Sequence, residues 1–184
     1  FERVDLADRR AAEAAVRRIA ETRGELSGVV TAAGTDACGP LEAVASEAWE
    51  RVIEVNLLGT AAVVRAALPH LERTRGRVVT VASTLGLRAL PDATAYCASK
   101  FGIVGFTRAL AAELGEGVGV TLLVPAGMRT RFFDGRPARY RPAPDAELMD
   151  PADVAEAAVF ALTRPAGTEV RELVMTVSNE PSWP

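Results

Sequence analysis

Short apolar runs suited to β-strands alternate with segments of helical pattern along the chain, and this alternation limits the possible folds more than any other feature. The strand-like runs, rich in β-branched residues, cover residues 27–34, 77–83, 119–124 and 170–177. Helical patterns begin after Asp8 and at Ser46, Thr94 and Asp150. Such alternation favours parallel strands joined by right-handed crossovers, with helices on both faces of the sheet. We therefore predict one α/β domain over residues 1–184, built on a doubly wound parallel sheet.

Charge and composition narrow the classes of partner. The net charge of −3 gives no electrostatic reason to expect a nucleic acid or an anionic membrane. Residues 1–8 lack the basic and apolar stretches of a signal peptide, and no apolar run approaches the roughly 18 residues that span a bilayer. Two cysteines and one histidine supply neither a disulfide framework nor a usual zinc site. We expect a cytoplasmic protein with no metal ion, no nucleic-acid partner and no membrane partner.

Three polar side chains are predicted to meet at one edge of the sheet. Tyr96 and Lys100 are four residues apart at the start of a predicted helix, so they share one helix face. Ser83 ends the strand before that helix. Ligands of open parallel sheets bind beyond the carboxyl ends of the strands. We therefore expect Ser83, Tyr96 and Lys100 to face one cleft.

These residue types suit hydride-transfer chemistry. Removing a proton from an alcohol while its hydride leaves requires a base that works near neutral pH, and a free phenol has a pKa of about 10. We expect the Lys100 ammonium to lower the pKa of the Tyr96 phenol, because a nearby cation favours the phenolate. The Ser83 hydroxyl can donate to a carbonyl oxygen as negative charge develops there. Lys100 can also reach the sugar hydroxyls of a cofactor.

Ser83 followed by Tyr96-Cys-Ala-Ser-Lys100 resembles the catalytic set of the short-chain dehydrogenase/reductase family, whose largest branch carries Tyr-x-Ala-Ser-Lys. The resemblance spans nearly the whole chain and implies a Rossmann-type oxidoreductase acting between NAD(P)(H) and a carbonyl or secondary alcohol. It implies that Tyr96 transfers the proton, Ser83 holds the substrate oxygen, and Lys100 tunes Tyr96 and holds the ribose. Asn56 matches the fourth catalytic residue, where the family's helix bend holds a water linking the lysine to solvent.

The same resemblance implies a set of cofactor contacts. They are Asp5, Leu6, Ala32, Ala33, Gly34, Tyr96, Lys100, Pro125, Ala126, Gly127 and Thr130. Asp5 would meet the adenine ring and Thr130 the nicotinamide carboxamide. The chain departs from the family where Ala126 replaces a glycine and where Thr31 and Ala32 replace asparagines. The implied cofactor is NADP or NAD, with NADP slightly favoured.

The family's opening strand, glycine-rich turn and helix, which cradle the cofactor pyrophosphate, have no counterpart in this chain. The one similar pattern, Gly115-Glu-Gly-Val-Gly119, follows a helix and precedes a strand, so we interpret it as a turn. We expect an upstream segment of about 50 residues that carries the first strands of the sheet. Without it, the strand ending at Gly34 would form an exposed apolar edge.

Residues 128–149 lack clear periodicity and are rich in proline, which predicts a long loop that serves as a substrate lid. Its arginines are Arg129, Arg131, Arg136, Arg139 and Arg141. They either capture an anionic substrate, such as a carboxylate or an acyl carrier, or form a solvated rim, which we favour. The final strand resembles the branch that acts on 3-oxo or 3-hydroxy acids.

Two alternatives to this enzymatic function remain open. The chain could be a truncated or non-catalytic relative that serves in binding or assembly, or an isomerase or dehydratase that recycles its cofactor. The family resemblance also implies a homotetramer or homodimer built through the Tyr96 helix, where Gly102 and Gly105 permit close packing. The tail, residues 180–184, is expected to pack against the domain or to fray.

Overall fold

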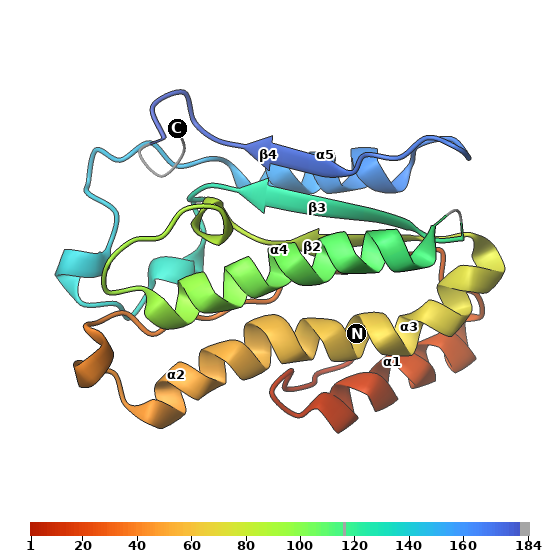
Figure 1. Cartoon of the computed structure of the whole chain (residues 1–184), viewed down its shortest axis with the longest axis horizontal. Helices are drawn as coiled ribbons and strands as arrows, with labels where there is room; N and C mark the ends of the chain where they lie inside the picture. Colours follow the sequence, from red (N-terminus) through yellow and green to blue (C-terminus); the bar gives the residue numbers. More distant parts are fainter. Residues whose placement is uncertain (116, 181–184) are drawn as a thin grey trace.

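Four parallel strands form the centre of the computed structural model, which describes residues 1–115 and 117–180 (Figure 1). The strands are β1 (Gly28–Thr31), β2 (Arg77–Val81), β3 (Gly119–Pro125) and β4 (Glu172–Met175). They lie in the sheet in chain order, and every neighbouring pair is parallel. The predicted α/β fold with a parallel sheet is confirmed.

Helices cover both faces of this sheet (Figure 1). They are α1 (Arg9–Arg23), α2 (Ser46–Ile53), α3 (Thr60–Thr74), α4 (Thr94–Leu114) and α5 (Pro151–Leu162). Neighbouring residues of a strand point to opposite faces, so Val78 packs with Leu71 and Leu110 of α3 and α4, while Val79 packs with Val154 of α5. Two buried layers therefore hold the strands from either side.

Local signals fix the starts of two helices where the sequence predicted them. The Asp8 carboxylate accepts a hydrogen bond from the Ala11 N–H, and the Asp150 carboxylate accepts one from Ala152. Pro151 occupies the first turn of α5, where its missing N–H costs nothing. The α4 helix has the predicted bounds, Thr94–Leu114.

The long helical stretch predicted from Ser46 is not α-helical throughout. A π-helical turn spans Glu54–Gly59, and Pro69 lies inside α3. A side chain at Gly59 would place its Cβ 2.7 Å from the carbonyl oxygen of Leu6. Glycine therefore lets the N-terminal segment pass close to this turn.

The combined stretch Ser46–Thr74 contains 29 residues and is apolar enough to cross a membrane by length and composition alone. This corrects the expectation that no run approaches that length. In the structure the stretch packs against α1 and α4, and it contributes Val52, Val64 and Leu71 to the buried core. Part of its apolar character therefore comes from residues that pack in the core.

Strands β1 and β2 end earlier than predicted, and the residues after them line the cavity described below. Strand β1 pairs only with β2 among the described residues and forms an edge, where Val30 is 43% exposed. The predicted turn between α4 and β3 includes residue 116, and most of the predicted tail is residues 181–184. Those positions lie outside the described residues.

Candidate active site

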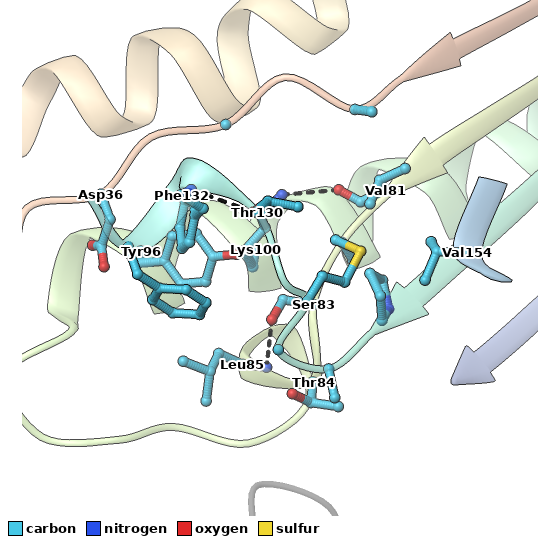
Figure 2. A pocket seen from close by; sticks show the side chains of 18 of the residues that line it. Asp36, Val81, Ser83, Thr84, Leu85, Tyr96, Lys100, Thr130, Phe132 and Val154 are labelled. Carbon is cyan, nitrogen blue, oxygen red and sulfur yellow. Dashed lines mark hydrogen bonds between the residues drawn. The ribbon is translucent and has the colours of Figure 1, made fainter. Parts of the chain in front are cut away.

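A cavity of about 1290 Å³ opens at the carboxyl end of the sheet (Figure 2). It is bounded by the ends of β1, β2 and β3, the first turns of α4, the loop 128–149 and one side of α5. Most of the predicted site residues line it: Ala32, Ala33, Gly34, Ser83, Tyr96, Lys100, Pro125, Ala126, Gly127 and Thr130. Asp5, Leu6 and Asn56 are not among its lining residues.

Tyr96 and Lys100 lie one turn apart on α4, and the Lys100 Nζ is 5.6 Å from the centre of the Tyr96 ring. The same Nζ donates a 2.9 Å hydrogen bond to the carbonyl oxygen of Val81 at the end of β2 (Figure 2). Ser83 follows two residues later, and its Oγ accepts the N–H of Leu85, 3.2 Å away. The strand end and the helix thus bring the three predicted side chains to one wall of the cavity.

Burial shifts the pKa values of both titratable groups on this wall. It raises the pKa of the Tyr96 phenol to about 12, and a hydrogen bond with Ser83 offsets part of that rise. Burial also lowers the pKa of Lys100 to about 8. We expected a lowered pKa for Tyr96, but the Lys100 ammonium is bonded to a backbone carbonyl and the desolvation of the phenolate has the larger effect.

Asn56 supports this wall from behind. It lies in the π-helical turn, is 1% exposed, and its Oδ1 accepts the N–H of Thr35 while its Nδ2 donates to the Thr35 carbonyl and to Ser99 Oγ. A Cβ at Gly34 would lie 3.6 Å from Asn56 Oδ1 and 3.8 Å from Lys100 Nζ. Asn56 therefore joins the loop after β1 to α4, and its own carbonyl oxygen accepts the Thr60 hydroxyl.

Asp5 and Leu6 lie away from the cavity. The Asp5 carboxylate forms an exposed ion pair with Arg51 at 2.9 Å and accepts the N–H of Ala7, so it closes a turn before α1. Leu6 covers Gly59 of the π-helical turn. Neither residue therefore lines the cavity with the other predicted cofactor contacts.

The loop 128–149, which we call the lid loop, is irregular as predicted. A β-bridge between Met128 and Met149 joins its ends, and it holds two short 3-10 turns, Arg131–Phe133 and Ala138–Tyr140. Thr130 begins the first turn, with its hydroxyl accepting the Phe132 N–H at 3.3 Å. Phe132 then lies 5.4 Å from Tyr96, ring centre to ring centre, so the lid loop forms the wall that faces α4.

Two acidic residues hold the lid loop against the rest of the domain. The sequence alone did not single them out. The Asp36 carboxylate pairs with Arg136 at 2.9 Å, and the Asp92 carboxylate accepts the Tyr140 hydroxyl at 2.9 Å. Asp36 lies five residues after the end of β1, just beyond Ala32, Ala33 and Gly34. This position is typical of site residues in parallel sheets, so a signal was available. Asp92, in a left-handed backbone conformation with φ of 61°, gave no comparable signal.

The lid arginines divide into two groups. Arg129 lies outside the cavity and pairs with Asp150, whereas Arg131, Arg136, Arg139 and Arg141 line the cavity. In the part of the chain that the structure describes, no group of three His, Cys, Asp or Glu side chains could hold a metal ion.

The cavity wall suits one half of a nicotinamide dinucleotide. The small, exposed residues after β1, Ala32 to Gly34, leave the backbone there open to close approach, and Ala126 with Gly127 lines the cavity after β3. The ammonium of Lys100, held beside Gly34, is a donor for sugar hydroxyls. These residues fit the nicotinamide and its ribose.

Comparison with known proteins agrees with this architecture. Residues 1–140 match the family model described as short chain dehydrogenase. A 2-(S)-hydroxypropyl-CoM dehydrogenase of Xanthobacter autotrophicus is 35% identical, with 82% of this chain and 64% of that protein covered. A related protein of the same organism, described as inactive, is also 35% identical over 88% of this chain and 76% of its own length. An uncharacterised oxidoreductase of Staphylococcus aureus is 31% identical, covering 93% and 73%.

Solved structures show the same fold. The alcohol dehydrogenase of Thermococcus sibiricus, complexed with 5-hydroxy-NADP, superposes with a TM-score of 0.85 at 26% identity, covering 95% of this chain and 73% of that one. The aldohexose dehydrogenase of Thermoplasma acidophilum gives 0.83 at 23% identity, covering 95% and 76%. The Rossmann-type fold is therefore confirmed, and with the family match over residues 1–140 the chain belongs to the short-chain dehydrogenases, a family of oxidoreductases.

Proposed function

We propose that this protein transfers a hydride between NADP(H) or NAD(H) and a carbonyl or secondary alcohol. The observation that carries the proposal is the meeting of Ser83, Tyr96 and Lys100 on one cavity wall, beside small residues that fit a nicotinamide riboside. When bound, the nicotinamide supplies or accepts the hydride. The side chains of this wall transfer the proton and stabilise the charge on the substrate oxygen.

In carbonyl reduction, the Tyr96 hydroxyl donates its proton to the substrate oxygen. Its pKa, raised by burial to about 12, keeps the phenol protonated at neutral pH and ready to act as an acid. The Ser83 hydroxyl donates to the same oxygen as negative charge develops. Lys100 holds sugar hydroxyls with its ammonium. In the oxidising direction it stabilises the Tyr96 phenolate, whose ring centre lies 5.6 Å from Nζ. Asn56 positions the backbone around Gly34 and α4.

NADP is the cofactor we favour, as in the analogue-bound Thermococcus structure. A secondary alcohol substrate is supported by the relatives named for 2-(S)-hydroxypropyl-CoM. The arginines along the cavity favour an anionic group on that substrate, such as the carboxylate of a 3-oxo or 3-hydroxy acid or an acyl carrier.

The remaining partner proposals concern assembly and location. The α4 helix exposes Phe101 at 45%, and Gly105 has open space beside its Cα, so this face suits a homodimer or homotetramer contact. The space beside Gly102 is instead filled by the chain itself, because a Cβ at Gly102 would lie 2.8 Å from the Leu57 side chain. Free Cys38 and Cys97 are compatible with a reducing cytoplasm.

The test is the variant Tyr96→Phe in the intact protein, assayed by nicotinamide absorbance against a panel of carbonyls and secondary alcohols. Loss of the phenolic proton is expected to lower turnover by about 100- to 10,000-fold, while circular dichroism stays unchanged. Equal turnover by wild type and variant would refute the role of Tyr96.

A non-catalytic binding function is the second candidate, because a relative 35% identical to this chain is described as inactive. It predicts cofactor binding without turnover on any substrate of the panel. A net change in nicotinamide absorbance during turnover would exclude it, and would also exclude an isomerase that recycles its cofactor.

A further inference from the structure

One ion pair differs from the others in its burial. The side chains of Asp36 and Arg136 are only 6% and 16% exposed, and their Oδ2 and Nη2 atoms are 2.9 Å apart. In seven other ion pairs at least one side chain is 50% exposed or more. Arg129 and Asp150, at the base of the lid loop, are for example 59% and 49% exposed. A buried pair is weakly screened by solvent, so its loss has large effects.

The pair is linked to Tyr96 by a chain of side-chain contacts. The Arg136 guanidinium lies over the rings of Phe132 and Phe133, 4.5 and 4.8 Å from their centres. Phe132 in turn lies 5.4 Å from Tyr96, and Figure 2 shows Asp36, Phe132 and Tyr96 at the same end of the cavity. The Asp36 carboxylate also accepts the Ala37 N–H at Oδ1 and the Cys38 thiol at Oδ2, the oxygen that pairs with Arg136.

The charges of the pair act on the phenol in opposite directions. The Asp36 carboxylate raises the pKa of Tyr96, and the Arg136 guanidinium lowers it. The other groups that face the phenol are Ser83 after β2 and Lys100 and Cys97 on α4. Cys38 stays neutral near pH 7, because burial and Asp36 raise the pKa of its thiol to about 11. Asp36 and Arg136 are therefore the oppositely charged groups that the lid contact brings together beside Tyr96.

We propose that Asp36 and Arg136 are positioning residues that hold the lid loop against Tyr96 and balance each other's charge near its side chain. The inference rests on the proposed function for its catalytic consequence. Opening the lid loop removes Arg136 and leaves the Asp36 carboxylate facing the phenol. The pair thus couples the position of the lid loop to the ease with which Tyr96 gives up its proton.

The test compares Asp36→Asn with Arg136→Gln in the intact protein at saturating cofactor. In alcohol oxidation Tyr96 acts as the base, so turnover rises with pH through its pKa. Asp36→Asn leaves a cation unbalanced, and the rise should move to lower pH by about 0.5 to 1 unit. Arg136→Gln leaves a carboxylate unbalanced, and the rise should move to higher pH by a similar amount. Arg136→Lys, which keeps the charge, should restore the wild-type profile.

Arg129→Gln is the matched control, since it removes a lid arginine whose ion pair is exposed and outside the cavity. Its pH profile should equal that of wild type. A second readout needs no turnover: the chain has two tyrosines, so in a Tyr140→Phe background carbon NMR of Cζ-labelled tyrosine reports Tyr96 alone. Its titration should move in the same two directions.

Opposite shifts in the two variants support the inference. Shifts of the same sign, or unshifted profiles in folded variants, would overturn it and leave the pair as a structural tie only. If Arg136→Gln does not fold, the nearly isosteric Asp36→Asn decides the sign by itself. Opposite NMR shifts in a protein without turnover would uphold the charge balance while refuting the proposed function.

Discussion

The two walls of the cavity are held in place by different kinds of contact. On the α4 wall, Lys100 is bonded to the Val81 carbonyl, and Asn56 is bonded to both backbone groups of Thr35. The lid loop opposite has no regular structure beyond the Met128–Met149 bridge at its ends and two short 3-10 turns. Its cavity side is tied by side chains alone, through Arg136 to Asp36 and Tyr140 to Asp92.

These two kinds of contact differ in how they respond to substitution. Backbone acceptors remain whatever side chain a neighbouring position carries, so the α4 wall keeps its geometry and suits the proton chemistry. A tie between two side chains is lost with a single substitution, so the lid loop can vary and suits substrate selection. We therefore expect substitutions on the α4 wall to affect turnover or global stability, and substitutions in the lid loop to affect its local opening.

After Tyr96→Phe, the largest effect should come from Ser83→Ala on the rigid wall. Loss of a hydroxyl that donates to the developing oxyanion is expected to lower turnover by about 100- to 1000-fold with little change in substrate KM. Steady-state kinetics with the best substrate of the panel measure both parameters. Ser27→Ala, at the exposed amino end of β1, is the matched control and should behave as wild type. A change in KM alone would assign Ser83 to ordinary substrate binding.

Lys100→Met should change how stability depends on pH. Because burial lowers the pKa of Lys100 from 10.5 to about 8, the unfolded chain binds the proton more tightly than the folded protein does. Stability therefore rises with pH between those two values, by about 3 kcal/mol over the full range. The difference in unfolding free energy between wild type and variant, from urea denaturation at about pH 7 and pH 10, should change by this order.

Comparing the pH dependence of stability of wild type with that of Lys100→Met isolates the contribution of Lys100. Cys38 and Tyr96, whose raised pKa values act in the opposite direction at high pH, are present in both. The carbonyl of Val81 loses its donor in the variant at every pH, so that cost does not alter the slope. Parallel stability curves would contradict the buried, weakly basic state of Lys100.

The smallest effect is expected for Tyr140→Phe in the lid loop. It removes the 2.9 Å hydrogen bond to Asp92, which is worth about 1 kcal/mol. Amide hydrogen exchange of the lid loop should become about five-fold faster, while exchange in β2 and β3 stays unchanged. Unchanged exchange in the lid loop would show that the Asp36–Arg136 pair holds it without help.

The features that were predicted correctly from the sequence depend on local signals. Helix α4 and the start of α5 follow from patterns within a few residues, and Ser83, Tyr96 and Lys100 meet because strand ends and helix starts meet in any parallel sheet. The tie between Asp36 and Arg136 joins residues 100 positions apart through a loop without periodicity, and no local pattern reports it. The raised pKa of Tyr96 was missed for a related reason, since burial depends on how the finished fold packs around the phenol.

The π-helical turn at Glu54–Gly59 has a consequence for the phase of the helices on either side. Such a turn contains one residue more than an α-helical turn, and each residue rotates a helix by about 100°. Deleting one residue there would give a continuous α-helix, but α2 would rotate by that angle relative to α3. Val52, now 1% exposed, would swing out of the interior, and Asn56 would lose its alignment with Thr35. The extra residue thus lets α2 and α3, which form one continuous helical stretch, present differently directed faces to the same domain.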